Sequence, residues 1–198
     1  MSAKLADEAF DAPRRAFSVA DLDRMIEAGI VDRDEKIELI DGELIVMAAK
    51  KFAHEFIKSE LVRHFIERSS RDLFVGVEAS LQLDRHTLVE PDVLACRRDR
   101  IILSPEGYIA APGADIGLLV EVADTTLRKD RTTKARLYGR HCVPEYWIVD
   151  TNALVIWCHR GPRDGEYGSV DPIASGEALS PLSPDLSGIS VRLADLAP

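Results

Sequence analysis

The sequence predicts a mixed α/β (α+β) fold in which helices pack against a β-sheet. Apolar residues in the segment 52–68 recur with helical spacing, and the segment 116–123 is an apolar run broken only by Glu121. Short runs rich in β-branched and aromatic residues follow in the last third of the chain. The predicted order is helix, hairpin, helix, strands, strand, helix, strands. This order differs from the regular alternation of a doubly wound fold.

Length and composition predict one domain over residues 16–198. A chain of 198 residues with 46% hydrophobic and 30% charged residues is long enough to bury its own core. Residues 1–15 are polar and carry charges of both signs, so we expect a disordered N-terminal lead-in there.

The first third of the chain predicts a helix, a hairpin and a second helix. Ser18 and Asp21 have the spacing of a helix cap, and Gly29 ends that helix. Asp41-Gly42 lies between two apolar runs in the segment 36–47, which is a strong signal for a tight turn. The second helix covers 52–68, with apolar residues at 52, 56, 57, 61, 62, 65 and 66.

The middle of the chain predicts three strands and a loop. Segments 73–83 and 88–96 are expected as single strands joined through Asp84-Arg85-His86. A loop rich in Pro, Gly and Ala spans 100–115, and the strand 116–123 follows it as a central strand.

The last part predicts a helix over 125–141 that Pro144 prevents from continuing. Further strands are expected over 146–149, 154–158, 166–170 and 189–193, with a turn at 161–165.

Composition narrows the classes of function. No stretch approaches the roughly 20 apolar residues of a membrane span, and no signal-type segment opens the chain, so we expect a cytoplasmic protein without membrane contact. Cys96, Cys142 and Cys158 lack paired spacing, which argues against disulfides or a zinc ribbon and predicts small buried residues. The net charge of -9 weighs against nucleic-acid binding by bulk attraction. Two basic clusters, 97–100 and 128–136, are the local exceptions, unless they are simply solvated faces.

Two carboxylates lie in apolar surroundings. Asp92 is expected inside the strand 88–96 and Glu121 inside the strand 116–123. A buried carboxylate is costly unless it is paired or binds a metal, and carboxylate oxygens suit Mg²⁺ or Mn²⁺. The alternative is that one or both acids pair with a core arginine or cap a loop.

A lysine on the next helix strengthens the metal hypothesis. Asp130, Lys134 and Tyr138 are spaced by four residues and therefore share one helix face. Lys134 would then reach a water or phosphate at the metal. The alternative is a surface ion pair between Asp130 and Lys134, worth only about a few tenths of a kcal/mol.

These pieces occur in an order that resembles the Uma-type family of restriction endonucleases, a branch of the PD-(D/E)XK nuclease-like superfamily. The matching segments cover most of the chain and are 36–43 (Lys-Ile-Glu-Leu-Ile-Asp-Gly-Glu), His54, 91–93, 119–123, Asp130-x-x-x-Lys134-x-x-x-Tyr138 and 143–150. Each segment is weak evidence alone, but the ordered set is specific.

The resemblance implies a restriction-endonuclease-like mixed β-sheet core flanked by helices, with Asp92 and Glu121 as metal ligands and Glu38 and His54 in supporting roles. Ala123 stands where the superfamily has its usual lysine, which makes Lys134 the candidate, ahead of Lys129. Asp124 also departs from the family, which usually has serine there. We interpret Asp124 as a helix cap in preference to a further ligand.

Several other residues keep alternatives open. Glu38 either supports the site, by binding metal or holding Lys134, or pairs with an arginine, and His54 is either a ligand or a first-turn polar residue. Tyr138 is expected to pack with a hydrogen-bonded hydroxyl. Tyr146 and Trp147 belong to the core or to a dimer face. No role is assigned to His64, His86, His141 or His159.

The functional hypothesis is a metal-dependent endonuclease that hydrolyses phosphodiester bonds in nucleic acid, with DNA as the favoured polymer. Asp92, Glu121 and the backbone carbonyl of Val122 would hold Mg²⁺ or Mn²⁺, and Lys134 would stabilise charge on the phosphate. The basic helix 128–136 would follow the phosphate backbone. A homodimer suits the cutting of two strands.

Two alternatives remain at this point. One is a catalytically silent module of the same fold that binds nucleic acid or a partner, and the other is a metal-dependent phosphoesterase acting on small substrates.

Overall fold

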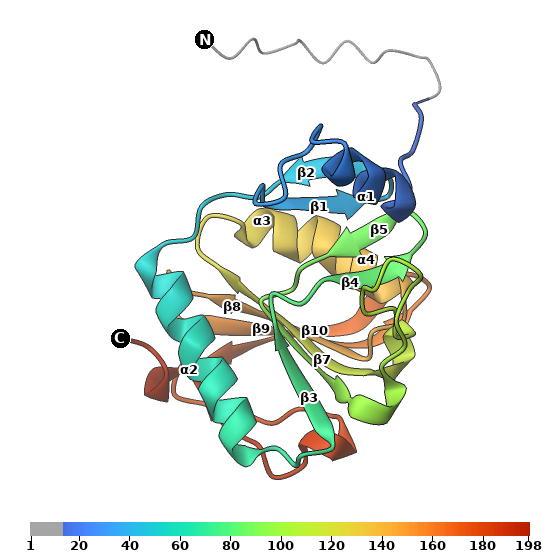
Figure 1. The fold of residues 1–198 in the computed structure, drawn as a ribbon. Helices are drawn as coiled ribbons and strands as arrows, with labels where there is room; N and C mark the ends of the chain where they lie inside the picture. Colours follow the sequence, from blue (N-terminus) through green and yellow to red (C-terminus); the bar gives the residue numbers. More distant parts are fainter. Residues whose placement is uncertain (1–13) are drawn as a thin grey trace.

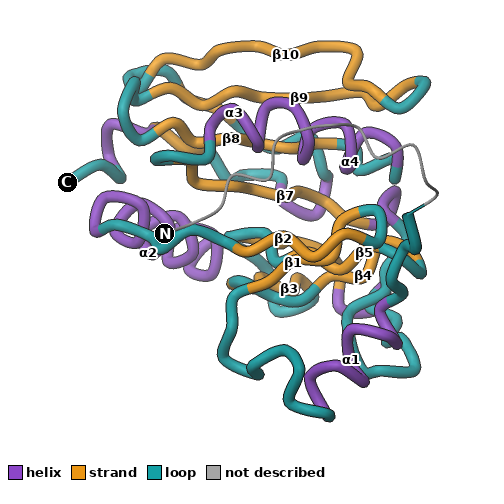
Figure 2. The backbone as a smooth tube through the Cα atoms, turned by 90° about the horizontal axis from the view of Figure 1, so that it is seen from above, coloured by secondary structure: helices purple, strands orange, loops and turns teal. Residues whose placement is uncertain are grey.

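The computed structural model describes residues 14–198 (Figures 1 and 2). Arg14 and Arg15 are exposed, and the rest of the expected lead-in lies outside the described residues. None of the described helices is long and apolar enough to cross a bilayer.

A mixed six-stranded sheet forms the centre of the molecule. Its strand order is β10-β9-β8-β7-β6-β3, with β7 and β8 parallel and the other pairs antiparallel. The bounds are β3 (Leu73–Val77), β6 (Val93–Arg97), β7 (Ile116–Ala123), β8 (Glu145–Asp150), β9 (Val155–Arg163) and β10 (Glu166–Ala174). The mixed sheet expected from the sequence is therefore present.

A smaller sheet, in the order β2-β1-β5-β4, lies beside it and carries the predicted hairpin. Its strands are β1 (Ile37–Ile40), β2 (Glu43–Val46), β4 (Leu81–Asp84) and β5 (Thr87–Val89). Asp41 and Gly42 connect β1 to β2 with φ of 51° and 81°. This is the left-handed turn that Asp-Gly favours, and a Cβ on Gly42 would lie 2.5 Å from that of Ala16.

The two expected long strands, 73–83 and 88–96, are each broken in two, so those predictions are wrong. The first gives β3 and β4, and the second gives β5 and β6, in different sheets. Glu78 adopts a left-handed φ of 48° at the first break. Pro91 lies at the second break, where it has no N–H to donate to a strand ladder. Asp92 therefore lies at a crossing between sheets, not inside a strand.

Helices cover the two faces of the large sheet (Figure 2). The predicted helix α2 (Phe52–Arg68) packs Ile57, Leu61 and Phe65 on one face, against a core that includes Val120 and Val122. The opposite core contains Leu119 and Ala123 of the same strand. Because side chains alternate along a strand, Glu121 belongs to this second face.

The second face is covered by a helical segment that starts later than expected. It consists of α3 (Leu127–Lys129), a π-helical turn (Asp130–Lys134) and α4 (Ala135–Arg140). The predicted helix at 125–141 is thus present with shorter ends and a widened middle turn.

The first helix and the C-terminal strands resemble the predicted elements, with two differences. Helix α1 (Val19–Glu27) has the predicted capping box between Ser18 and Asp21. The hairpin of β9 and β10 is longer than expected, so its turn lies at Asp164 and Gly165. The strand expected at 189–193 is reduced to β12 (Val191–Arg192), paired with β11 (Ala178–Leu179).

The three cysteines form no disulfide. Cys96 and Cys158 are buried as expected, whereas Cys142 is exposed, which corrects that part of the prediction.

Candidate active site

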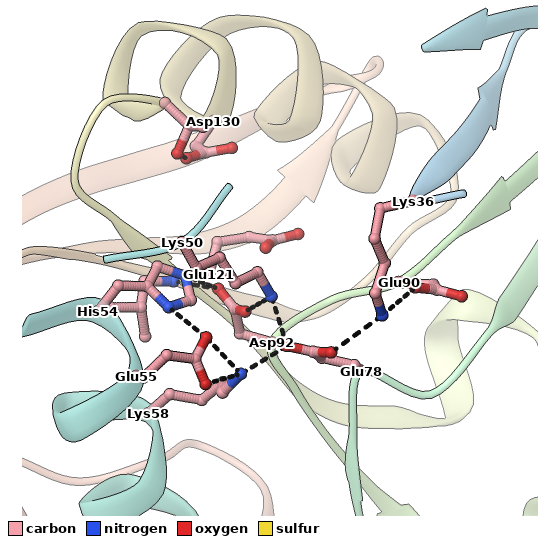
Figure 3. A network of polar contacts seen from close by, with 12 residues as sticks. Lys36, Lys50, His54, Glu55, Lys58, Glu78, Glu90, Asp92, Glu121 and Asp130 are labelled. Carbon is pink, nitrogen blue, oxygen red and sulfur yellow. Dashed lines mark hydrogen bonds and ion pairs between the residues drawn. The ribbon is translucent and has the colours of Figure 1, made fainter. Parts of the chain in front are cut away.

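The strand register brings Asp92 beside Glu121. Val93 of β6 pairs with Val120 of β7 in an antiparallel ladder, so the next positions along each strand are Asp92 and Glu121. Both side chains enter the same buried region, and they lie close together in Figure 3. The register therefore makes the two residues neighbours, although Asp92 precedes its strand instead of lying inside it.

Asp92 is 2% exposed and has several partners. Its Oδ2 accepts the backbone N–H of Val122 at 2.8 Å and lies 3.1 Å from His54 Nε2. Its Oδ1 accepts from Lys50 Nζ at 2.7 Å. Burial opposes ionisation, but His54 and Lys50 outweigh it and hold the pKa of Asp92 below its ordinary value.

Glu121 has a different environment. Its Oε1 accepts from Lys134 Nζ and from the Tyr138 hydroxyl, each at 2.9 Å. Complete burial raises the pKa of Glu121 to about 8, and the charges of Asp92, Asp130 and Glu38 add to this against the opposing effect of Lys134. The two neighbouring carboxylates are thus shifted in opposite directions, which is a common property of functional sites.

Lys134 connects two elements of the site. Its ammonium donates to Glu38 of β1 and to Glu121 of β7, and its side chain is 2% exposed. Burial would lower the pKa of Lys134, but the charges of Glu121 and Glu38 raise it above its ordinary value. The surface ion pair between Asp130 and Lys134 is not formed. Asp130 is buried and accepts from Thr126 Oγ1 at 2.6 Å.

Glu38 and His54, expected in supporting roles, both reach this region. Glu38 is fully buried and accepts from Lys134, from Lys129 Nζ at 3.1 Å and from the Glu90 N–H at 3.1 Å. Burial would raise the pKa of Glu38, but Lys134 and Lys129 lower it. Its partners are lysines, not the arginine of the alternative interpretation. His54 lies in the first turn of α2 and contacts Asp92, and its Nδ1 has no hydrogen-bond partner.

Several residues of the network, among them Lys50, Lys58 and Glu78, were not predicted from the sequence. Lys50 Nζ lies 2.7 Å from Asp92 Oδ1 and 2.5 Å from Glu78 Oε1. Lys58 bridges Glu55 and Glu78 (Figure 3). The pair Lys50-Lys51 just before the helix of His54 was the available signal for Lys50. Glu78 gave none, because its role depends on a left-handed turn between sheets.

The contacts and burial of the remaining candidate residues show which of the expected roles each one has. Asp124 does not cap the helix, which starts at Leu127 without a side-chain cap. It pairs with Lys51 at 3.2 Å instead. Tyr138 is buried with its hydroxyl on Glu121, as expected. Tyr146 and Trp147 are fully buried core residues.

A cavity of about 290 Å³ opens onto these groups. Five carboxylates line it: Glu38, Asp92, Glu121, Asp124 and Asp130. The lysine ammonium groups of Lys50, Lys129 and Lys134 belong to the same lining. The cavity therefore combines oxygen donors with positive charge, a combination suited to a phosphate ester and a hard cation.

The described side chains offer Mg²⁺ a small set of donors. Among residues 14–198, no group of three or more His, Cys, Asp or Glu side chains converges on one metal position. Mg²⁺ keeps several waters and needs only one or two carboxylates. Asp92 and Glu121 line the same cavity, together with Val122, and this pair would meet that smaller requirement.

The fold has a solved counterpart. The crystal structure of "a putative nuclease belonging to DUF820 from Anabaena variabilis ATCC 29413" superposes with a TM-score of 0.66. The match has 21% identity and covers 86% of this chain and 94% of that chain. It confirms the expected restriction-endonuclease-like fold class.

Comparison by sequence gives the family. No curated protein matches the chain. The model of the Uma2 family, described as "Putative restriction endonuclease", matches residues 19–194. This match covers nearly the whole described chain and agrees with the resemblance found in the motifs. The chain is therefore a member of the Uma2 family.

Proposed function

We propose that this protein is a divalent-metal-dependent endonuclease that hydrolyses phosphodiester bonds in nucleic acid, with DNA as the favoured substrate. One observation carries the proposal. Asp92, Glu121 and Lys134 meet at one cavity, and three further carboxylates, Glu38, Asp124 and Asp130, line it. Membership of the Uma2 family supports the same class of reaction.

Asp92, Glu121 and the Val122 carbonyl would hold Mg²⁺ or Mn²⁺. The bound ion would supply a water of lowered pKa and would polarise the phosphate. The Val122 N–H and His54 orient Asp92 through its Oδ2. Lys134 and Tyr138 orient Glu121 through its Oε1. These contacts keep both carboxylates in place, so little reorganisation is needed for the reaction.

Lys134 supplies positive charge at the floor of the cavity. Its ammonium already donates to Glu38 and Glu121, so it holds the two carboxylates as well as stabilising the charge of a bound phosphate. Lys129, which is 31% exposed, reaches Glu38 from the cavity rim and is a second cation for the substrate.

The test is cleavage of single- and double-stranded DNA and RNA with Mg²⁺ or Mn²⁺. Glu121→Gln and Asp92→Asn proteins are prepared in parallel with the parent. Asp164→Asn is the matched control, because it removes one carboxylate charge at a position 92% exposed. We expect the first two substitutions to lower the cleavage rate at least about a hundredfold and the control to leave it unchanged. Equal cleavage by all four proteins would contradict the proposal.

A catalytically silent binding module is the second candidate. It is favoured by one observation, that both oxygens of Asp92 already have partners within the chain, namely Lys50, His54 and Val122. Nucleic-acid binding without cleavage by the parent protein would favour it. Hydrolysis of small phosphodiesters but no polymer would instead favour the phosphoesterase.

A further inference from the structure

We propose that Lys50 is a built-in cation of the active site, which occupies Asp92 in the metal-free protein and moves onto Glu78 when a divalent metal binds. The proposal rests on the proposed metal-dependent function and adds a residue to it. It predicts that Lys50 sets the metal affinity of the site.

The two carboxylate oxygens of Asp92 have different partners. Its Oδ2 is occupied by the Val122 N–H and His54. Its Oδ1 has Lys50 Nζ at 2.7 Å. An ammonium ion and Mg²⁺ both seek carboxylate oxygen, so they compete for the same atom.

Lys50 also has a second carboxylate within reach. Its Nζ lies 2.5 Å from Glu78 Oε1, so the ammonium is already shared between Glu78 and Asp92 (Figure 3). Lys58 and Lys36 donate to the same glutamate, and the hydrogen bonds and charges of Lys50 and Lys58 lower its pKa to about 2 in spite of partial burial. Because Glu78 already accepts from the Lys50 ammonium, it can keep that ammonium when a metal takes Asp92.

The position of Lys50 allows this movement. It lies in the loop between β2 and α2, and its side chain is 22% exposed. Lys134, in contrast, is 2% exposed and enclosed between Glu38 and Glu121 on a helical segment. Of these two cavity lysines, Lys50 is the one that can leave its carboxylate without opening the core.

The first experiment measures Mn²⁺ affinity of the full chain, without nucleic acid, by titration calorimetry and by electron paramagnetic resonance. Lys50→Met removes the charge and keeps the aliphatic stem. We expect it to tighten Mn²⁺ binding about tenfold, because a hydrogen bond between charged groups contributes roughly one factor of ten. Lys50→Arg keeps the competing charge and should bind Mn²⁺ like the parent.

Lys51→Met is the matched control. It removes the same charge from the adjacent position of the same loop, but Lys51 pairs with Asp124 and not with Asp92. A general change of potential in the cavity would therefore tighten binding in both Met variants. Only direct competition at Asp92 would make Lys50→Met differ from Lys51→Met.

The second experiment uses Glu78→Gln, alone and combined with Lys50→Met. Loss of Glu78 should confine the ammonium to Asp92 and weaken Mn²⁺ binding in the parent background. The same substitution should have little effect when Lys50 is absent, because a coupling that acts through Lys50 disappears with it. An equal effect of Glu78→Gln in both backgrounds would overturn the transfer to Glu78.

The outcomes separate this proposal from the function on which it rests. If the parent binds Mn²⁺ and Lys50→Met binds it equally or more weakly, Lys50 does not compete and the metal-dependent function stands. If neither protein binds Mn²⁺, both proposals are overturned. Circular dichroism of the metal-free variants checks that each is folded before affinities are compared.

Discussion

At the scale of single residues, the site is organised by cations that are shared between buried carboxylates. Lys134 forms ion pairs with Glu38 and Glu121, and Lys50 forms ion pairs with Asp92 and Glu78. A buried carboxylate without such a partner would cost several kcal/mol. Each lysine therefore contributes to stability, and this contribution can be measured separately from its proposed role in the cavity.

Replacing Lys134 by Met should destabilise the protein strongly. The substitution leaves Glu38 and Glu121 buried with fewer partners, and breaking such a buried arrangement costs about 3–5 kcal/mol. Lys129→Met is the comparison, because Lys129 also donates to Glu38 but is 31% exposed, and its loss should cost about 1 kcal/mol or less. Urea unfolding at neutral pH measures both, and equal losses would contradict this account of Lys134.

Glu121 should make the stability of the protein depend on pH. Its pKa is raised to about 8 in the folded state from an ordinary value of 4.5, because it is buried among other carboxylates. The folded state therefore holds a proton that the unfolded state has lost between these two values. This stabilisation is complete below pH 4.5 and is lost as the pH rises through 8, with a slope of at most about 1.4 kcal/mol per pH unit.

The measurement is the free energy of unfolding of the parent and Glu121→Gln, from pH 5 to 9 without metal. Because the glutamine cannot ionise, the parent should lose stability relative to Glu121→Gln as the pH rises through 8. Parallel curves would show that Glu121 does not keep its proton.

At the scale of secondary-structure elements, irregularities place the key side chains. The break between β5 and β6 puts Asp92 at a crossing between sheets, and the π-helical turn carries Asp130 and Lys134. Turns of this kind are rare and occur often at functional sites. The regular elements, by contrast, determine on which face of the sheet a side chain lies. Strand β7, for example, directs Glu121 away from the core that α2 covers.

Another buried carboxylate, Glu145, joins elements outside the cavity lining. It begins β8 and accepts from Arg160 Nε of β9 at 2.8 Å, from Trp147 Nε1 at 2.9 Å and from the backbone N–H of Leu182 at 2.6 Å. Glu145→Ala should lower the free energy of unfolding by about 3–5 kcal/mol, since it leaves these donors unpaired.

The matched control for this prediction is Glu166→Ala. Glu166 is 74% exposed and lies 3.8 Å from Arg136, so its removal should leave stability unchanged within error. Metal binding should be retained in Glu145→Ala at temperatures where it is folded. Loss of metal binding there would mean that Glu145 also supports the site.

At the scale of the whole molecule, the charge distribution sets how nucleic acid can approach. The net charge of -9 repels a polyanion. The segment 127–140 presents Arg128, Arg131 and Arg136 to solvent, and its Lys129 and Lys134 line the cavity. Arg131 stacks over Trp157 at 3.8 Å from the ring centroid. We expect nucleic acid to approach over the basic face formed by this segment.

DNA affinity should then fall steeply with salt and depend on that face. Arg128→Gln should reduce the slope of log K against log salt by about 1, the contribution of roughly one phosphate contact. The control is Arg163→Gln at the end of β9, where the side chain is 88% exposed, and this variant should keep the parent slope. Fluorescence anisotropy of labelled DNA over a series of salt concentrations, in Ca²⁺ to prevent cleavage, makes the measurement. Identical slopes for parent and Arg128→Gln would contradict the assigned face.

The sequence alone determined the elements with strong local signals. The capping box at Ser18, the Asp41-Gly42 turn, helix α2 and strand β7 all follow from short-range patterns and appear as expected. It also indicated Asp92 and Glu121, because an ionisable group in an apolar run needs a partner, and Lys134 by its helical spacing. The resemblance to the family added Glu38 and His54.

Only the tertiary structure decided which partner each of these residues has. Lys50 meets Asp92 across 42 positions of sequence, and Lys134 meets Glu38 across 96. Such pairs depend on sheet register and on where the chain crosses between sheets, and neither leaves a periodic trace in the sequence. The left-handed backbone of Glu78 and the raised pKa of Glu121 likewise depend on the tertiary structure. The field at a buried group is the sum over all neighbours, and the fold brings those neighbours from distant parts of the chain.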